Sequence, residues 1–526
     1  MKKVATFVQW IKEKLFNQKV ELNIEAEQTE NTNITQTANV FNFIIPSILL
    51  SIVLIAIVIW GINQYQKSKY DLSPMNGNLN VAVVRFSDWT KGGCDIERNS
   101  GTLIANAFYA QLESDRLKDQ FYQNSNILLQ LRSPNELSAL SGNTNDEVTK
   151  SAENLAVQIN AQIVIYGVIT CSELTEKPSY QVIFYVAPAS FGDAQELIGE
   201  FSFSSDTLSG GITSGQDYAD LNKSLQQKVE IISLVVKSIA SYLGENYSRS
   251  LDFLSNALDS SLWESQSGEE VIYIIAGNAA TKLGLNLLTN GNDSRAISDI
   301  EQARDYYNKA NAITVTEGKG DYARSYIGLA GVENFYANLK TITSNNINDM
   351  DLSAIKREQD LLDKAEIAVY SPITADIPQK VAFDRAQISL AFYQLREDID
   401  YLGSAKTNYL SIISSYNDGN IRIREMAAHS YAGLAIIARI TRDAKSAISD
   451  YEFAIQITRI PSLQAQYLLQ LGNTYYENGD QKSALPYYEE TLKRKSDLKN
   501  RVPASIITDL ETKVEQIKQS LPTTSP

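Results

Sequence analysis

One uninterrupted apolar stretch near the amino terminus dominates the hydrophobic pattern of the chain. Phe43 to Ile62 carries no charged side chain, and its only polar side chains are Ser47 and Ser51. At the rise of an α-helix, about 20 residues span the hydrocarbon core of a bilayer. A helix also satisfies its own backbone hydrogen bonds there. We therefore expect a single transmembrane helix within residues 41–65.

The tail before this stretch, residues 1–40, combines a basic amphipathic segment with a polar one. Between residues 3 and 16 the apolar side chains fall on one helical stripe flanked by lysines, a pattern typical of helices that lie on anionic membrane surfaces. A helix packed on another protein and a disordered tail are the alternatives. Residues 21–40 are rich in Glu, Asn, Thr and Gln. Such a composition buries no core and indicates a linker.

Residues 77–204 alternate between strand patterns and helix patterns. Runs rich in β-branched residues predict strands at 80–86, 127–131 and 162–170. Segments with helical spacing of apolar residues lie between them, at 101–117 and 147–159. This order requires parallel strands joined by right-handed crossovers. We expect a small α/β domain that ends in an antiparallel pair of strands, 180–187 and 196–203.

The two cysteines of the chain, Cys94 and Cys171, follow two of the predicted strands. Cys94 lies in the loop after the first strand, and Cys171 directly follows the third. In a sheet of order 2-1-3 these strands are neighbours, and both loops leave the same edge. Two readings stay open. One is a disulfide between the two, which would fit an oxidising compartment, and the other is a pair of unrelated buried thiols.

The pattern changes after residue 204. Ser205–Asp220 is rich in glycine and serine, which predicts a linker between domains. From 221 to 500, amphipathic helices follow one another in pairs. Residues 501–526 contain a polar helix typical of the end of a helical repeat array.

The clearest helical pair resembles a tetratricopeptide repeat (TPR). In Ser462–Arg494, Gly472 lies on the first helix and Tyr488 on the second, with Asn478-Gly479-Asp480 as the turn. A small residue lets two helices cross closely, and an aromatic residue fills the gap to the next repeat. Looser matches precede this unit at spacings near the family's roughly 34 residues. The expected fold class is therefore mixed: one transmembrane helix, a small α/β domain, and an all-α TPR solenoid.

The α/β segment is similar to the amino-terminal domain of TolB-type periplasmic proteins. The similarity rests on the strand sequence NVAVVRFSD, on the helix after it, and on the strand sequence AQIVIYGVIT. It covers roughly a quarter of the chain. In that family the domain is an interaction module outside the cytoplasm, so the resemblance implies binding rather than catalysis.

Motifs that carry chemistry are missing from the sequence. It has no GxxxxGK[ST] phosphate loop, no HExxH, no GxSxG and no CxxC. One histidine, His429, leaves little imidazole chemistry. The net charge of −15 argues against nucleic acid, whose binders carry basic faces. We expect no enzymatic activity and no cofactor or metal.

Two functions of different classes fit these patterns. The first is a membrane-anchored scaffold whose repeats bind a protein or peptide in a groove. In TPR proteins the groove residues come from the first helix of each pair, and carried over to this chain they are Arg324, Asn334, His429, Arg439, Asn473 and Tyr476. The alternative is a transmembrane sensor, because open α/β sheets bind ligands at the carboxyl edge of their strands. Its ligand loop would comprise Ser87, Asp88, Trp89 and Gly92.

The orientation of the chain in the membrane follows from weaker signals. Five lysines in the tail favour a cytoplasmic amino terminus, whereas Lys67 and Lys69 beside the span argue for the opposite orientation. Long domains cross membranes largely regardless of flanking charge. We expect a single-pass protein of the cell membrane with its folded domains outside the cytoplasm.

Overall fold

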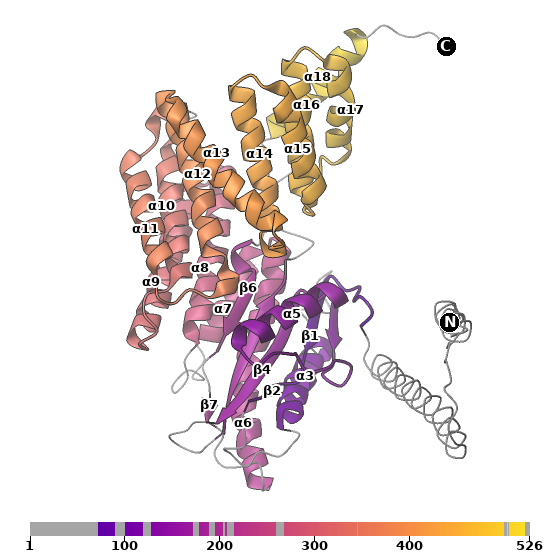
Figure 1. Ribbon diagram of the computed structural model, residues 1–526, viewed down its shortest axis with the longest axis vertical. Coiled ribbons are helices and arrows are strands. Elements are labelled where there is room, and N and C mark those ends of the chain that lie inside the picture. The colour runs from indigo at the N-terminus through magenta and orange to yellow at the C-terminus, as the bar shows by residue number, and fades with distance from the viewer. Residues whose placement is uncertain are drawn as a thin grey trace, which may run out of the picture. The chain divides into compact units, whose positions relative to one another are not determined.

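The computed structural model describes most of the chain that follows the predicted transmembrane segment (Figure 1). The described residues are 72–520, except 90–99, 119–127, 172–177, 189–194, 204–205, 208–214, 259–267, 345, 499–501 and 503. Contacts divide the chain into two compact units, Met1–Lys69 and Tyr70–Pro526. The predicted tail and transmembrane helix lie outside the described residues and stay predictions. The second unit holds both the sheet and the helical pairs.

A mixed β-sheet forms the beginning of the second unit. Its described strands are β1 (Leu79–Val83), β2 (Ser87–Asp88), β3 (Leu129–Arg132), β4 (Ile163–Cys171), β5 (Pro178–Val186), β6 (Gly199–Ser202) and β7 (Asp206–Thr207). The strand order is β3-β1-β4-β5-β6. β1 lies between two parallel neighbours, β3 and β4, and β5 pairs antiparallel with β4 and β6. The predicted parallel order and the closing antiparallel pair are both confirmed.

Helices cover both faces of this sheet. Alternate residues of a strand point to opposite faces, and in β1 Val81 and Val83 belong to one hydrophobic core whereas Ala82 belongs to another. α3 (Ser100–Lys118) contributes to the first core, and α5 (Asn145–Ile159) contributes to the second. Both helices were predicted, each within two residues of its observed ends.

The predicted linker, residues 205–220, contains regular structure. β7 lies within it and pairs with β5, and the long helix α6 (Gly215–Leu243) begins inside it. Further along α6, Val235 and Ile239 are buried in the same core as β1 and α3. The Gly/Ser composition predicted a linker between domains, but composition alone does not show the apolar stripe of the helix that follows. The core of the sheet therefore continues into the helical part.

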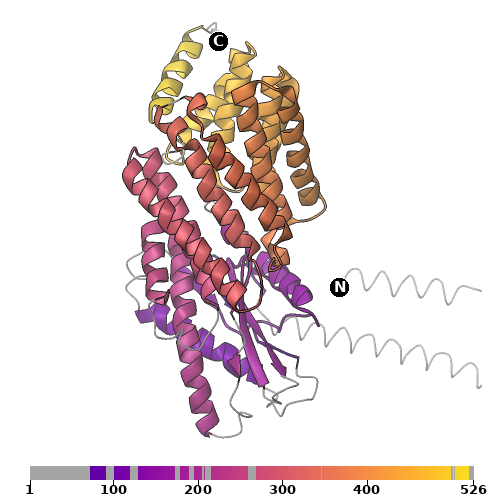
Figure 2. The same cartoon turned by 90° about the vertical axis from the view of Figure 1, so that its left-hand side faces the viewer.

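The described residues after the sheet are mainly helical, which confirms the expected helical second part. Its long helices are α7 (Tyr247–Leu258), α8 (Glu269–Thr289), α9 (Asp293–Thr316), α10 (Ala323–Ser344), α11 (Leu352–Ile367), α12 (Ile377–Arg396), α13 (Ile399–Asn417), α14 (Arg424–Ile440), α15 (Ala444–Ile457), α16 (Pro461–Glu477), α17 (Gln481–Lys493) and α18 (Ala504–Ser520). Each helix packs on the next, so that they form successive hairpins (Figures 1 and 2). The length of these helices varies from 24 residues in α9 to 12 in α7.

Glycines and tyrosines recur where helices of this part cross closely. A Cβ atom placed on Gly472 of α16 would lie 2.6 Å from the ring of Tyr488 on α17. The same contact would be 2.4 Å between Gly433 of α14 and the ring of Tyr409 on α13. Since real Cβ atoms do not approach rings so closely, only glycine fits at these positions. The predicted close crossing at Gly472 is present.

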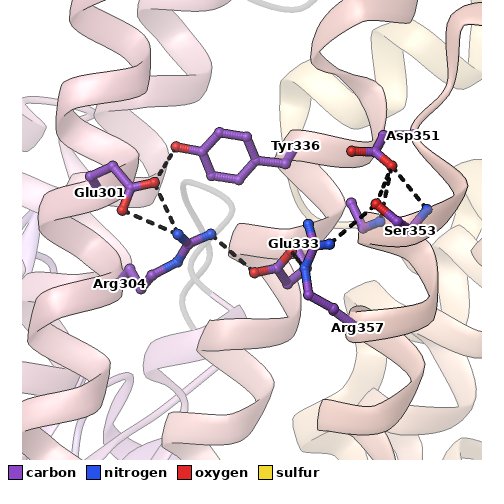
Figure 3. A network of polar contacts seen from close by, with 8 residues as sticks. Glu301, Arg304, Glu333, Tyr336, Asp351, Ser353 and Arg357 are labelled. Carbon is purple, nitrogen blue, oxygen red and sulfur yellow. Dashed lines mark hydrogen bonds and ion pairs between the residues drawn. The ribbon is translucent and has the colours of Figure 1, made fainter.

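A polar network joins α9, α10 and α11, as Figure 3 shows. Arg304 of α9 donates hydrogen bonds to Glu301 on its own helix and to Glu333 of α10, at 3.0 Å each. Arg357 of α11 donates to the second oxygen of Glu333 at 2.7 Å, and the hydroxyl of Tyr336 donates to Glu301. Each of these charges has a partner, so the network fixes one hairpin against the next.

Among the described residues, one helix, α8, is long and apolar enough to cross a membrane. Of its most apolar 18-residue window, 61% is buried inside the protein. Ile272, Ile275 and Ala279 of α8 lie in the hydrophobic core that also contains α9 and α10. Packing against neighbouring helices accounts for the apolar composition of α8, which is therefore a core helix.

Candidate functional site

A cavity of about 430 Å³ lies among the first helices of four successive pairs. Its walls come mainly from α8, α10, α12 and α14. Tyr307 of α9 and Glu196 of the short helix η1 (Gln195–Leu197), which precedes β6, also line it. We call it the first-helix cavity. Pockets of a few hundred Å³ with apolar walls and a few polar groups are typical binding sites. The cavity is therefore the candidate site.

Arg324 of α10 joins one end of the cavity to the sheet. The side chain is 4% exposed, and its guanidinium group donates to the carbonyl oxygens of Glu196, Ile198 and Glu200 at 3.2–3.4 Å. It also lies 4.2 Å from the ring centre of Phe201. Burial lowers the pKa of Arg324. These contacts close the cavity at the α10 end with residues of the α/β part.

Lys380 and Asp384 lie one helical turn apart on α12 and both line the cavity. Protein surrounds both side chains, although each keeps some contact with solvent through the cavity. Burial and the nearby Arg324 lower the pKa of Lys380 to about 7. Burial raises the pKa of Asp384 to about 7, and Lys380 partly opposes that shift. Two groups that change charge near neutral pH in one cavity are typical of functional sites.

Other polar residues of the cavity wall have protein partners. Lys282 of α8 pairs with Glu196 at 3.6 Å. The carboxylate of Glu425 on α14 accepts hydrogen bonds from the hydroxyl of Thr458 at 2.5 Å and from the backbone N–H of Arg459 at 3.0 Å. These groups therefore help to hold the walls together.

The remaining wall includes large apolar side chains and open space. Ile327, Phe383 and Met426 contribute large hydrophobic side chains from three different helices. Gly331 of α10 lines the same cavity, and nothing lies within 4 Å of a Cβ atom placed there. The cavity thus combines hydrophobic and charged side chains, so it can bind a molecule that has apolar and charged groups.

Two of the six residues predicted for the groove, Arg324 and His429, line this cavity. His429 also hydrogen-bonds to Tyr467 of α16 through Nδ1, at 2.8 Å. The side chain of Arg324 is directed to the carbonyl groups of the α/β part, which the repeat pattern could not indicate. The structure thus brings together a pair of predicted residues that lie more than a hundred positions apart in the sequence.

The other four predicted groove residues bond to neighbouring helices. Asn334 donates to Glu358 of α11 at 3.1 Å, and Arg439 pairs with Glu477 of α16 at 2.7 Å. Asn473 accepts a hydrogen bond from Tyr488 at 2.9 Å. The ring of Tyr476 lies 4.7 Å from the ammonium group of Lys513 on α18. None of the four lines the first-helix cavity, and their contacts hold helices in place.

The first two residues of the predicted ligand loop of the α/β part belong to a β-strand. Ser87 and Asp88 form β2 and pair with Val168 and Ile169 of β4. β4 is nine residues long, so it extends past β1 and provides this second pairing partner. Trp89 packs on the hydrophobic core beneath α5. Gly92 lies outside the described residues.

The predicted disulfide involves one described residue. Cys171 is the last residue of β4, and the described part of the chain contains no free cysteine. Cys94 lies outside the described residues. The pairing of Cys94 with Cys171 therefore stays a prediction.

The residues predicted from sequence did not include Lys380 and Asp384, two cavity residues whose pKa values are both shifted to about 7. The available signal was a lysine and an aspartate at positions i and i+4 of a helix, with only the apolar residues Val381, Ala382 and Phe383 between them. Among the described residues, no group of three or more His, Cys, Asp or Glu side chains is placed to hold a metal ion.

A second contact between the sheet and the helices lies near the start of α14. Arg422, in the short helix η5 (Ile421–Ile423), donates to both carboxylate oxygens of Glu153 on α5, at 3.0 and 3.2 Å. The same guanidinium group pairs with Asp376 at 2.9 Å. Arg422 and Arg324 thus connect the α/β part to two separate places in the helical part.

Comparisons with known proteins add little to this picture. No protein-family model matches the chain, and no curated protein matches it. Among solved structures, the crystal structure of BtubC (BKLC) from P. vanneervenii is similar at a TM-score of 0.31 and 16% sequence identity. The match covers 49% of this chain and 92% of that chain. A similarity at this level carries no argument about fold or function, so function must be argued from the site itself.

Proposed function

We propose that this chain is a membrane-anchored scaffold, in which tetratricopeptide-like helical pairs bind a protein or peptide partner over the first-helix cavity. The stretch from Phe43 to Ile62 supplies the anchor. The observation that supports the binding role is the cavity itself, because α8, α10, α12 and α14 each contribute to it. A partner segment laid across these helices contacts several hairpins at once.

The composition of the cavity wall agrees with recognition of a partner. Phe383 and Met426 supply the hydrophobic contact area that anchors a side chain of a bound segment. Lys380 and Asp384 supply charges that select among partners, since a buried charge left without a counterpart disfavours a wrong ligand. These four side chains can recognise a partner without any chemical reaction.

Two glycines provide a test that leaves the fold intact. Gly331 on α10 and Gly403 on α13 are interior helical positions, and a Cβ atom placed on either has open space around it. Only Gly331 lines the first-helix cavity. Gly331→Trp should therefore fill the cavity, whereas Gly403→Trp adds the same side chain elsewhere.

The experiment starts with peptides selected from a phage-displayed library on the full chain in detergent. Their affinities are then measured for the unaltered protein and for both variants. We expect Gly331→Trp to weaken binding by at least tenfold and Gly403→Trp to leave it unchanged. Selected peptides that bind all three proteins equally would place the partner site outside the cavity and refute the proposal.

A further inference from the structure

A second cavity, of about 970 Å³, lies between α5 and loops of the helical part. One side of α5 lines it, together with β6, residues from 369–374 between α11 and α12, and residues 418–422 between α13 and α14. We call it the α5 cleft. It shares no lining residue with the first-helix cavity. Its volume lies at the upper end of the range of small-molecule sites, so it is a separate candidate site.

The side chains that line the α5 cleft carry more negative than positive charge. They comprise four carboxylates and two cations, namely Asp146, Glu153, Glu200, Asp418, Lys150 and Arg422. Arg422 is already bonded to Glu153 and to Asp376, a carboxylate outside the lining. Within the described residues, Asp146 and Asp418 have no ion pair and no side-chain hydrogen bond. The carboxylates of the lining thus outnumber its cations by two.

Glu200 of β6 is a partly buried carboxylate that is held by neutral groups. The hydroxyl groups of Thr149 and Tyr166 donate hydrogen bonds to it, and it has no ion pair in the described part of the chain. Burial raises the pKa of Glu200, and these hydrogen bonds and the charge of Arg324 only partly oppose that shift. The negative charge of Asp146 raises it further. A cation brought to this place would therefore stabilise the ionised form of Glu200.

Tyr322 adds an unused hydrogen-bonding group to the wall of the cleft. Its side chain is 2% exposed, and its ring packs on that of Tyr370 with the ring centres 4.7 Å apart. Among the residues that the structure describes, nothing hydrogen-bonds to the hydroxyl group of Tyr322. Its oxygen is not enclosed by protein, so it is open to the cleft. Since polar groups at buried positions are normally hydrogen-bonded, this oxygen indicates a ligand that donates a hydrogen bond.

The placement of the carboxylates favours an organic cation over a metal ion. In the described ranges no three His, Cys, Asp or Glu side chains are placed to hold a metal ion together. The unpaired carboxylates of the cleft come instead from three separate elements, with Asp146 on α5, Glu200 on β6 and Asp418 at the end of α13. Negative charges distributed in this way match a ligand whose positive charges are separated along a chain.

We propose that the α5 cleft binds an aliphatic polyamine, with one ammonium group at Glu200 and Asp146 and another at Asp418. An ammonium group has three donors and no acceptor, and its hydrogen bonds to carboxylates are charge-assisted. The hydroxyl oxygen of Tyr322 supplies a further, neutral acceptor. This site goes beyond the scaffold role and does not rest on it, because its residues lie outside the first-helix cavity.

The test uses three probes that share a four-carbon body: 1,4-diaminobutane, 1-aminobutane and 1,4-butanediol. Isothermal titration calorimetry measures their binding to the full chain in detergent, with protein-free detergent as the reference. Physiological salt screens the general attraction of cations to a chain of net charge −15. We expect the diamine to bind at least tenfold more tightly than the monoamine, and the diol to bind more weakly than both.

Variants of the carboxylates locate the binding. Glu200→Gln keeps a similar shape and should weaken binding of the diamine by at least tenfold. Asp418→Asn should weaken it several-fold. The matched control is Asp252→Asn, which removes the charge of an exposed aspartate on α7 that does not line the cleft. We expect this control to leave the affinity unchanged.

Two further variants keep the proposal testable if Glu200→Gln does not fold. Tyr322→Phe removes only a hydroxyl group without a partner, and it should weaken binding of the diamine several-fold. Lys150→Met removes a positive charge from the lining and should strengthen binding several-fold, an effect that damage to the fold cannot produce. Lys445→Met, the control on the exposed side of α15, should not change the affinity.

Several results would overturn the assignment. These are equal binding of the diamine and the monoamine, equal affinities in Glu200→Gln and Asp252→Asn, an affinity that Lys150→Met leaves unchanged, and no binding of the diamine up to 10 mM. Magnesium ions or a lysine-containing peptide that bind through Glu200, when the diamine does not, would also overturn it, in favour of a metal or a partner's side chain. If the diamine fails while selected peptides still lose affinity in Gly331→Trp, the scaffold proposal stands alone.

Discussion

Two glycines of α10 allow helix propensity to be separated from packing. A Cβ atom on Gly328 would lie 2.2 Å from the ring of Tyr307 on α9, whereas one on Gly331 would meet nothing within 4 Å. Alanine in place of a helix-interior glycine gains roughly 1 kcal/mol at either position. At Gly328 the new methyl group also overpacks the contact, which costs roughly 1–3 kcal/mol. The propensity gains cancel, so the difference between the two variants measures the packing cost.

Tyr307 has little freedom to move away from a new methyl group. It is 2% exposed, and its hydroxyl donates to Asn278 of α8 at 2.7 Å. The ring is also confined by α8, because a Cβ atom on Gly277 would lie 2.5 Å from it. We therefore expect Gly328→Ala to destabilise α9 and α10 relative to Gly331→Ala by about 1–3 kcal/mol.

Amide hydrogen exchange measured by mass spectrometry is the suitable assay, since a chain of this size need not unfold in two states. Peptides from α9 and α10 should exchange faster in Gly328→Ala than in Gly331→Ala. The double variant with Tyr307→Leu should recover part of the loss, which reports direct coupling between the two positions. Equal exchange in the two alanine variants would refute the close packing of Gly328 on Tyr307.

Three further predictions concern other parts of the chain. Arg422→Met should cost about 3 kcal/mol and speed exchange in α5, because it leaves two nearly buried carboxylates without their cation. Arg385→Met, which breaks exposed pairs, should cost less than about 1 kcal/mol, and equal losses would contradict the distinction. Burial raises the pKa of Glu358 to about 8, so its contribution to stability is complete below about pH 4.5 and is lost progressively as the pH rises to 8. Denaturant unfolding should therefore show Glu358→Gln gaining stability relative to the unaltered protein between pH 5 and 8, and parallel pH profiles would count against this. In cells whose protein lacks the natural cysteines, a membrane-impermeant thiol reagent should label a single cysteine placed at Asn478 but not one placed at Gln28, and the reverse pattern would invert the proposed topology.

The sheet could be predicted from sequence because local signals agreed with the tertiary arrangement. The strands around Val81 and Ile165 are runs of β-branched residues, and the helices between them require a parallel order. The predicted strand order was therefore correct. Strand β2 was missed because Ser87 and Asp88 carry no hydrophobic pattern, and only the length of β4 makes their pairing possible.

The site was less accessible to prediction, because the partners of its side chains are distant in the sequence. Two residues that the repeat pattern assigned to the groove, Arg324 and His429, line the same cavity. The pattern could not show that Arg324 bonds to backbone carbonyls of the α/β part, since no sequence pattern marks a carbonyl oxygen as an acceptor. Likewise, the pKa of Lys380 is lowered chiefly by burial and by Arg324 of α10, which is distant from it in the sequence.

The continuous core between the sheet and α6 affects how the protein can fold during synthesis. The ribosome releases the strands first, yet Val81 and Val83 share their core with Val235 and Ile239 of α6. The part of that face that α3 does not cover stays open to water until α6 has emerged. The carbonyl of Ile198 lacks its Arg324 donor for longer still. Apolar strands exposed over this interval are prone to aggregate. Synthesis of this protein therefore demands either a slow collapse of the sheet or a chaperone that covers it until the first helices arrive.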